Sequence, residues 1–186
     1  MKKILFILLL LFTSFSVNAQ FKATKDGIVT ENGEKFYVVN IEGKSAVDLY
    51  KSANSWVIAN FKNPNVVANK QENEMINVHG VFPAAFICKK VMGVEISAKV
   101  DMNIVMYFKD GRVRFDIPVI QSMYFNDKDQ VMFSGGVNIM GEGDINMFKN
   151  NGKPNKEKVI KAFNEFINGE INSIIEYMKG QKNEDW

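Results

Sequence analysis

The stretch VEISAKVDMNIVMYFKDGRVRFDIPVI, residues 94–120, decides the fold of this chain. Its even positions from Val94 to Phe108 are apolar, whereas most of the odd positions between them are polar. Alternation of this kind is typical of a β-strand with one buried face and one solvated face. Asp110-Gly111 follows, and this pair tolerates the positive φ angles of a tight hairpin turn. The stretch therefore predicts a long antiparallel hairpin.

The turn also predicts which residues lie opposite each other. A two-residue loop fixes one register, and in that register all the apolar pairs share one face. The predicted apolar pairs are Phe108 with Val113, Met106 with Phe115, Ile104 with Ile117, and Met102 with Val119. The predicted pairs on the polar face include Tyr107 with Arg114 and Asn103 with Pro118.

Residues 1–19 have the pattern of a secretory signal peptide. Two lysines precede an apolar run from Ile4 to Leu11, and small residues lead up to Ala19. The apolar run is too short to span a bilayer comfortably, and no cysteine lies nearby to carry a lipid. We therefore expect cleavage after Ala19, no stable membrane anchor afterwards, and a protein that is periplasmic or secreted.

The charge balance bears on the class of partner. The sequence has 23 basic and 21 acidic residues, and two of the lysines, Lys2 and Lys3, lie in the leader. The chain after Ala19 is therefore formally neutral. A neutral chain gives no electrostatic reason to expect nucleic acid or an anionic membrane surface as a partner.

Two amphipathic helices accompany the predicted strands. Ser45 and Asp48 fit a capping box, and the helix that follows ends before Asn63-Pro64, because proline disfavours helical geometry in the residue before it. A second helix over 155–179 carries a continuous apolar stripe. Shorter strands are expected at 36–41, 66–68 and 75–82, residues 83–93 are ambiguous, and residues 125–153 are expected to be loop-rich.

These elements predict an α+β fold with two layers. The order β-α-β-β-β-β-α gives one twisted antiparallel sheet with two helices packed on one face. Residues 35–180 would form a single domain. A mobile segment over 20–34 would precede it, with turn signals at Lys25-Asp26-Gly27 and Glu31-Asn32-Gly33 and a small hairpin about Asn32-Gly33, and a polar tail over 181–186 would follow.

Three local patterns carry a resemblance to a known family. They are Ser45-x-x-Asp48-Leu49-Tyr50 leading to Trp56 and Phe61, the hairpin tip Lys109-Asp110-Gly111-Arg112-x-Arg114, and the long closing helix. With the element order, they resemble a family of secreted Gram-negative domains of unknown function that has a TATA-binding-protein-like (TBP-like) fold. The resemblance covers roughly residues 35–180. It implies the fold and supplies no catalytic residues, and the likeness to the TATA-binding protein is one of shape only.

Catalytic, cofactor and metal motifs are missing from the sequence. One histidine and one cysteine exclude the usual zinc sites. Residues 126–131 lack the glycine and the closing glutamate of a calcium loop. Residues 136–141 have P-loop spacing, but Glu142 stands where lysine must meet phosphate. We therefore predict no catalytic residue, no metal and no cofactor.

A carboxylate-based hydrolase remains the enzyme hypothesis, because the chain has many acidic residues. The predicted register places Asp101 opposite Ile120 and Asp116 opposite Val105, so these two carboxylates are not neighbours. Cys88 is interpreted as a buried small side chain, with an intermolecular disulfide or a reactive thiol as the alternative.

The polar face of the hairpin supports a binding hypothesis. Tyr107 beside Arg114 on an open sheet is a candidate contact for an unknown protein or small-molecule ligand, with Asn103 and His79 as further candidates. An ordinary solvated face with a cross-strand pair is the alternative. The leading prediction is an exported, non-enzymatic binding or interaction module. A carrier for a small apolar ligand, using methionines in 123–147, is the second hypothesis.

Overall fold

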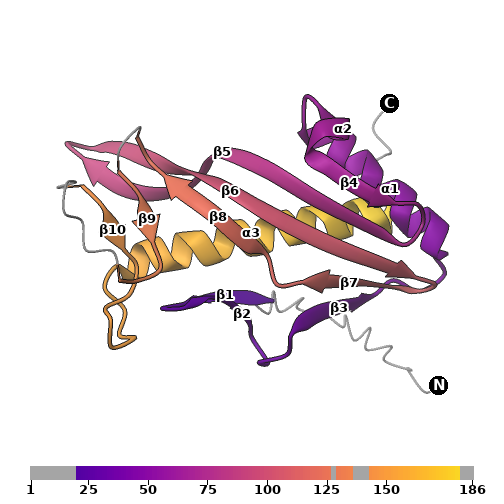
Figure 1. The fold of residues 1–186 in the computed structure, drawn as a ribbon, viewed down its shortest axis with the longest axis horizontal. Coiled ribbons are helices and arrows are strands. Elements are labelled where there is room, and N and C mark those ends of the chain that lie inside the picture. Colours follow the sequence, from indigo (N-terminus) through magenta and orange to yellow (C-terminus); the bar gives the residue numbers. More distant parts are fainter. Residues whose placement is uncertain (1–19, 127–128, 136–142, 181–186) are drawn as a thin grey trace, which may run out of the picture.

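The computed structural model describes residues 20–126, 129–135 and 143–180. It has the predicted α+β architecture, in which a six-stranded sheet and two long helices form two layers (Figure 1). The sheet order is β3-β7-β6-β5-β4, and β8 also pairs with β6. The bounds are β3 Phe36–Asn40, β4 Ala68–Gln71, β5 Met75–Val91, β6 Val94–Lys109, β7 Arg112–Asp116 and β8 Val119–Tyr124.

The predicted hairpin forms the centre of this sheet. The structure pairs Phe108 with Val113 and Met106 with Phe115, as the turn requires. The even-numbered side chains from Ala98 to Phe108 are buried, with at most 5% of their surface exposed. At the start of β6 this pattern weakens, because Ile96 is half-buried and Val94 is 65% exposed.

Beyond Asp116 the predicted register is wrong. The strand breaks at Ile117-Pro118, because proline has no N–H to continue the ladder. When pairing resumes in β8, it has shifted by one residue, and a second irregularity follows between Asp101 and Met102. The observed pairs are Asn103 with Val119, Met102 with Ile120, and Asp101 with Ser122. Val119 accordingly leaves the apolar face and is 53% exposed.

The ambiguous residues 83–93 continue β5 and turn it into β6. The pairing of β5 with β6 shifts between Phe82 and Phe86, and Ala84 there has a φ of 53°. An extra residue with helical or left-handed backbone is typical of a β-bulge. A tight turn at Met92-Gly93 then reverses the chain.

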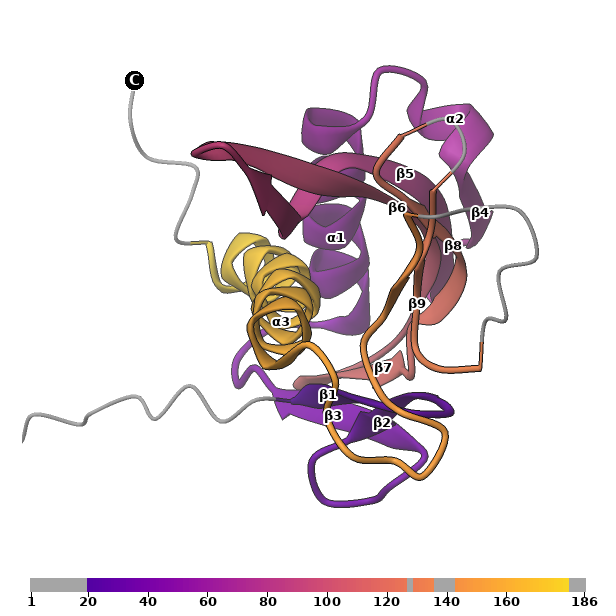
Figure 2. The same ribbon diagram turned by 90° about the vertical axis from the view of Figure 1, so that its left-hand side faces the viewer.

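The helices α1 (Ala46–Asn60) and α3 (Glu157–Lys179) cover one face of the sheet. Figure 2 looks nearly along α3 and shows both helices on the same side of β5 and β6. The capping box is present, with Ser45 Oγ accepting from the Asp48 N–H. Trp56 is completely buried between the layers, and its Nε1 donates to Ser173 Oγ at 3.1 Å. The predicted helix pair is therefore confirmed.

The N-terminal segment differs from the prediction. Residues 20–34 are predicted to be mobile with a hairpin at Asn32-Gly33, but β1 (Phe21–Thr24) and β2 (Gly27–Thr30) form a hairpin at the other predicted turn, Lys25-Asp26-Gly27. Phe21 is fully buried, and Asn168 of α3 accepts from the Phe21 N–H and donates to its carbonyl. The hairpin is held beside α3 because the Asn168 side chain binds backbone groups of β1 that do not pair with β2.

Smaller elements complete the chain. A short helix, α2 (Pro64–Val67), stands where the sequence favours a strand, because proline starts a helical turn well. In the region expected to be loop-rich, β9 (Val131–Met132) and β10 (Ile145–Asn146) pair in parallel. Among the described residues, none of the helices combines the length and the apolar character needed to cross a bilayer.

Candidate functional site

The sheet face opposite the helices carries apolar side chains that no described element covers. On β6 this face holds the odd-numbered residues, and its neighbours follow from the register of β3, β5, β7 and β8. We call it the open face. Its large exposed apolar residues are Phe36 (39% exposed), Val38 (41%), Val81 (49%), Tyr107 (38%) and Val119 (53%). An uncovered apolar surface of this kind is typical of a contact surface.

Arg114 is the centre of the best-organised part of the open face. The predicted pairing of Tyr107 with Arg114 is present, and Val38 of β3 lies on the other side of Arg114. The Arg114 guanidinium carbon lies 4.1 Å from the centre of the Tyr107 ring and 5.3 Å from that of Phe36. Both distances are within the range of a cation–π contact. Two aromatic rings from different strands therefore hold one cation in place.

A carboxylate completes this arrangement. Asp116 Oδ1 lies 3.1 Å from Arg114 Nε, so the two groups form an ion pair, although the Nε–H is not aligned for a hydrogen bond. About four tenths of each side chain is exposed, and such a pair contributes little to stability. Its effect is to restrict where the guanidinium lies.

A hollow of about 210 Å³ opens beside the stacked guanidinium. Its walls come from three neighbouring strands: Val38, Tyr107, Lys109, Arg112 and Arg114. One apolar side chain, one aromatic ring and three cations therefore surround it. The sequence analysis missed Val38, Lys109 and Arg112, although the Lys-Asp-Gly-Arg tip already placed two of these cations opposite each other.

The other two candidate residues lie elsewhere on the open face. His79 and Asn103 are directly paired across β5 and β6, four residues along β6 from Tyr107. His79 Nε2 lies 2.8 Å from Asp101 Oδ1, and the His79 side chain is 60% exposed. The Oδ1 of Asn103 is buried without a hydrogen-bond partner. The four candidates therefore share one face but form two separate groups.

The two carboxylates considered from the sequence, Asp101 and Asp116, do not come together, and the cysteine is buried. Asp101 of β6 binds His79 of β5, whereas Asp116 binds Arg114 within β7. Cys88 is buried, with Sγ 3.4 Å from the Ile96 carbonyl oxygen, and burial raises the pKa of its thiol. A raised pKa disfavours the reactive thiolate. The part of the chain that the structure describes contains no group of three His, Cys, Asp or Glu side chains placed to hold a metal.

The carrier hypothesis concerns the methionines of residues 123–147, and the described ones lie partly in the core and partly beside a groove. Met123 and Met147 are buried in the core, with 4% and 0% exposure. A groove of about 360 Å³ does lie between β8 and residues 130–134, but its walls include Gln121, Ser122 and Ser134. Met123 and Met132 also line this groove, so two methionines of the carrier hypothesis border a groove that has polar walls as well.

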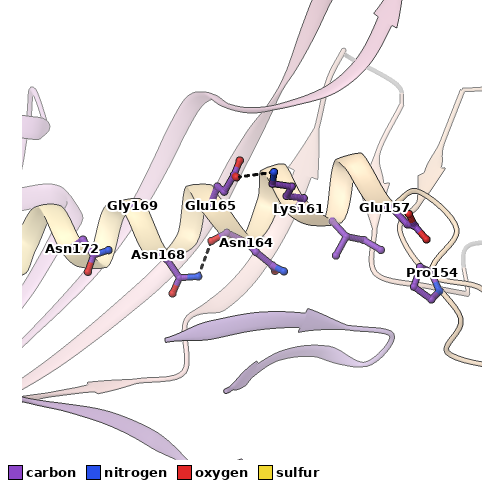
Figure 3. Close-up of a pocket in the computed structure, with 9 residues that line it drawn as sticks. Pro154, Glu157, Lys161, Asn164, Glu165, Asn168, Gly169 and Asn172 are labelled. Carbon is purple, nitrogen blue, oxygen red and sulfur yellow. Dashed lines mark hydrogen bonds and ion pairs between the residues drawn. The ribbon is translucent and has the colours of Figure 1, made fainter. Parts of the chain in front are cut away.

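The outer side of α3 carries a larger hollow of about 580 Å³ (Figure 3). Asn164, Asn168 and Asn172 lie at its edge, one helical turn apart. Asn164 and Asn168 accept from backbone N–H groups of β1, and Asn172 accepts from the Gln20 side chain. Their polar atoms therefore already serve to hold the N-terminal hairpin, which makes this row of asparagines structural.

The comparisons with known proteins address the fold. No family model matches the sequence, and neither does any curated protein. A TBP-like protein from Parabacteroides distasonis has a TM-score of 0.50 and 14% sequence identity, over 80% of this chain and 92% of that one. This chain has a TBP-like fold. A DUF4468 family protein from Bacteroides ovatus has a TM-score of 0.49 and 13% identity, over 77% of this chain and 84% of that one.

A TBP-like fold by itself does not identify a function, because one fold can carry many unrelated sites. The names of the two similar proteins state neither an enzymatic activity nor a ligand. The function has to be inferred from the open face and its chemistry.

Proposed function

We propose that this protein is an exported, non-enzymatic binding module that contacts its partner through the open face of its sheet. The observation that carries the proposal is the Arg114 guanidinium stacked between Tyr107 and Phe36 on an uncovered face. Tyrosine and arginine are the residue types that most often dominate binding energy at interfaces. Their fixed positions mean that little side-chain freedom is lost when a partner binds.

The surroundings of the stack support the same function. Phe36, Val38 and Tyr107 are each about four tenths exposed, so burying them would favour association through the hydrophobic effect. Lys109 and Arg112 border the same area and add charge at its edge. Apolar residues at the centre and charged residues at the rim are typical of a protein interface.

The test compares partner capture by the wild-type protein and a Tyr107→Ala/Arg114→Ala variant. Each is immobilised and exposed to a cell-envelope extract of the bacterium that produces it, and a captured component is then purified for binding measurements. We expect the double variant to lose at least about tenfold in affinity, because two central interface residues are removed.

Lys99→Ala is the matched control, since Lys99 lies on the same strand and is paired with Tyr124, away from the stack. It should bind as the wild type does. Equal affinity of the double variant and the wild type, with unchanged thermal unfolding, would show that this face is not the contact surface.

Export and family membership belong to the same proposal. The leader pattern of residues 1–19 supports cleavage after Ala19 and a periplasmic or secreted location. The TBP-like fold supports membership of the secreted family of domains of unknown function that the sequence resembles. The intact mass of protein recovered from outside the cytoplasm tests export: a chain that still begins at Met1 contradicts it.

A further inference from the structure

The hollow beside Arg114 has an excess of positive charge. Lys109, Arg112 and Arg114 line it, and Asp116, which binds Arg114, is the carboxylate beside them. Within the described part of the chain, Lys109 and Arg112 have no ion-pair partner. Asp110 of the turn does not line the hollow, and its Oδ1 accepts from the Ala46 N–H at the start of α1. The three lining cations together with Asp116 therefore carry a net charge of +2, on a chain that is neutral after Ala19.

The three cations converge because of the hairpin register. Lys109 lies directly opposite Arg112, and Arg114 directly opposite Tyr107, all on the open face. Like charges placed opposite each other are unfavourable in a sheet. The turn itself requires only Asp110-Gly111, so neither turn geometry nor packing accounts for the pair of cations next to it.

The hollow also has an apolar side. Val38 and Tyr107 form part of its wall, and both are substantially exposed. The Arg114 guanidinium is already held by stacking and by Asp116, and a planar guanidinium is well suited to binding oxygen anions. A ligand matching this wall would combine a doubly charged anion with a flat or apolar group.

We propose that the hollow binds the phosphate monoester group of a small, partly apolar molecule. A phosphate monoester carries about −1.5 to −2 charges at pH 7 and so matches the local charge of +2, whereas a single carboxylate leaves one positive charge uncompensated. A hollow of about 210 Å³ has room for a small organic phosphate. This inference names the ligand of the proposed binding module and rests on that proposal.

Isothermal titration calorimetry with phenyl phosphate tests the assignment, with benzoate as the singly charged comparison. We expect phenyl phosphate to bind the wild type more tightly than benzoate. Arg112→Ala should weaken phenyl phosphate about tenfold or more, because a charge-assisted hydrogen bond is lost. Lys99→Ala removes a cation from the same face outside the hollow and should leave the affinity unchanged.

The pH dependence gives a second, independent measurement. The second pKa of a phosphate monoester is about 6, so affinity should fall by about tenfold between pH 7.5 and pH 5. The ionisable groups facing the hollow are Tyr107, Lys109, Arg112, Arg114 and Asp116, and none of these types ordinarily titrates in that interval. Val38 and Met75, which flank the same row on β3 and β5, carry no charge.

Three results overturn the phosphate assignment: no binding of phenyl phosphate, equal affinity for benzoate, or no effect of Arg112→Ala. If Tyr107→Ala/Arg114→Ala still abolishes capture of a partner in those cases, the open face remains the contact surface and only the ligand class is wrong. Tighter binding of a tyrosine-phosphorylated peptide than of phenyl phosphate would also overturn it, since the ligand would then be a protein.

Discussion

The two faces of the central sheet are built from the same strands, but only one of them has its apolar side chains buried. On the covered face of β6, the apolar side chains are excluded from water by α1 and α3, and most are completely buried. On the open face, Phe36, Val38 and Tyr107 keep about four tenths of their surface exposed. Packing explains the residue types of the covered face. It does not explain those of the open face, and this contrast is the reason to assign function there.

The largest expected effect separates the two faces by stability. Phe115 and Tyr107 are aromatic residues on adjacent strands, one fully buried and one 38% exposed. Phe115→Ala should lower the free energy of unfolding by about 3–5 kcal/mol, because it leaves a cavity in the core. Tyr107→Ala should cost about 1 kcal/mol or less, mainly from the lost contact with Arg114.

Urea unfolding of both variants measures the difference. A comparable loss from Tyr107→Ala would mean that the open face supports the fold as strongly as the covered face does, and the functional argument from its composition would fail.

The pattern of the hairpin made both the covered face and the central contact of the open face predictable. Alternation over 94–108 with Asp110-Gly111 decides which side chains are buried, and the short turn fixes Tyr107 opposite Arg114. These are local signals, because the paired residues are close in the sequence. The same reasoning failed beyond Asp116, because the strand breaks at Ile117-Pro118 and pairing resumes one residue out of the predicted register.

The remaining features depend on contacts between distant residues. Phe36 reaches Arg114 only because β3 pairs with β7, although α1 and the strands β4 to β6 separate these two strands in the sequence. The contact of His79 with Asp101 depends on the register of β5 with β6, for which the sequence offers no short turn signal of the Asp-Gly type. The docking of β1 on Asn168 joins residues 147 positions apart.

An intermediate effect is expected where α3, one of the helices that cover the sheet, holds the N-terminal hairpin. Asn168 is 6% exposed, accepts from the N–H groups of Gln20 and Phe21 and donates to the Phe21 carbonyl. Asn168→Ala should lower the free energy of unfolding by about 2–3 kcal/mol, because buried backbone groups lose their partners. Hydrogen exchange at Phe21 should also become faster.

Asn172→Ala is the control on the same helix, because Asn172 accepts only from the Gln20 side chain among the contacts described here. Its cost should stay below about 1 kcal/mol. Equal costs for the two variants would show that the hydrogen bonds of Asn168 to β1 add no more stability than the single side-chain contact of Asn172.

The smallest effect concerns the start of α1, one of the two helices that make the covered face. Hydrogen bonds from the Ser45 side chain and backbone lower the pKa of the Asp48 carboxyl below its ordinary value of 3.8. A carboxyl whose pKa is lower in the folded state contributes stability above its unfolded pKa and loses it as the pH falls through the folded pKa. Asp48→Ala should therefore be less stable than the wild type at pH 6, and the difference should shrink by pH 3.

Ser55→Ala, an uncharged change on the same helix, should show no such dependence on pH. If the free energies of unfolding of Asp48→Ala and the wild type differ by the same amount from pH 6 to pH 3, the charge of Asp48 does not stabilise the helix. The helix α1 would then be held on the covered face by the burial of its apolar side chains, without help from this cap.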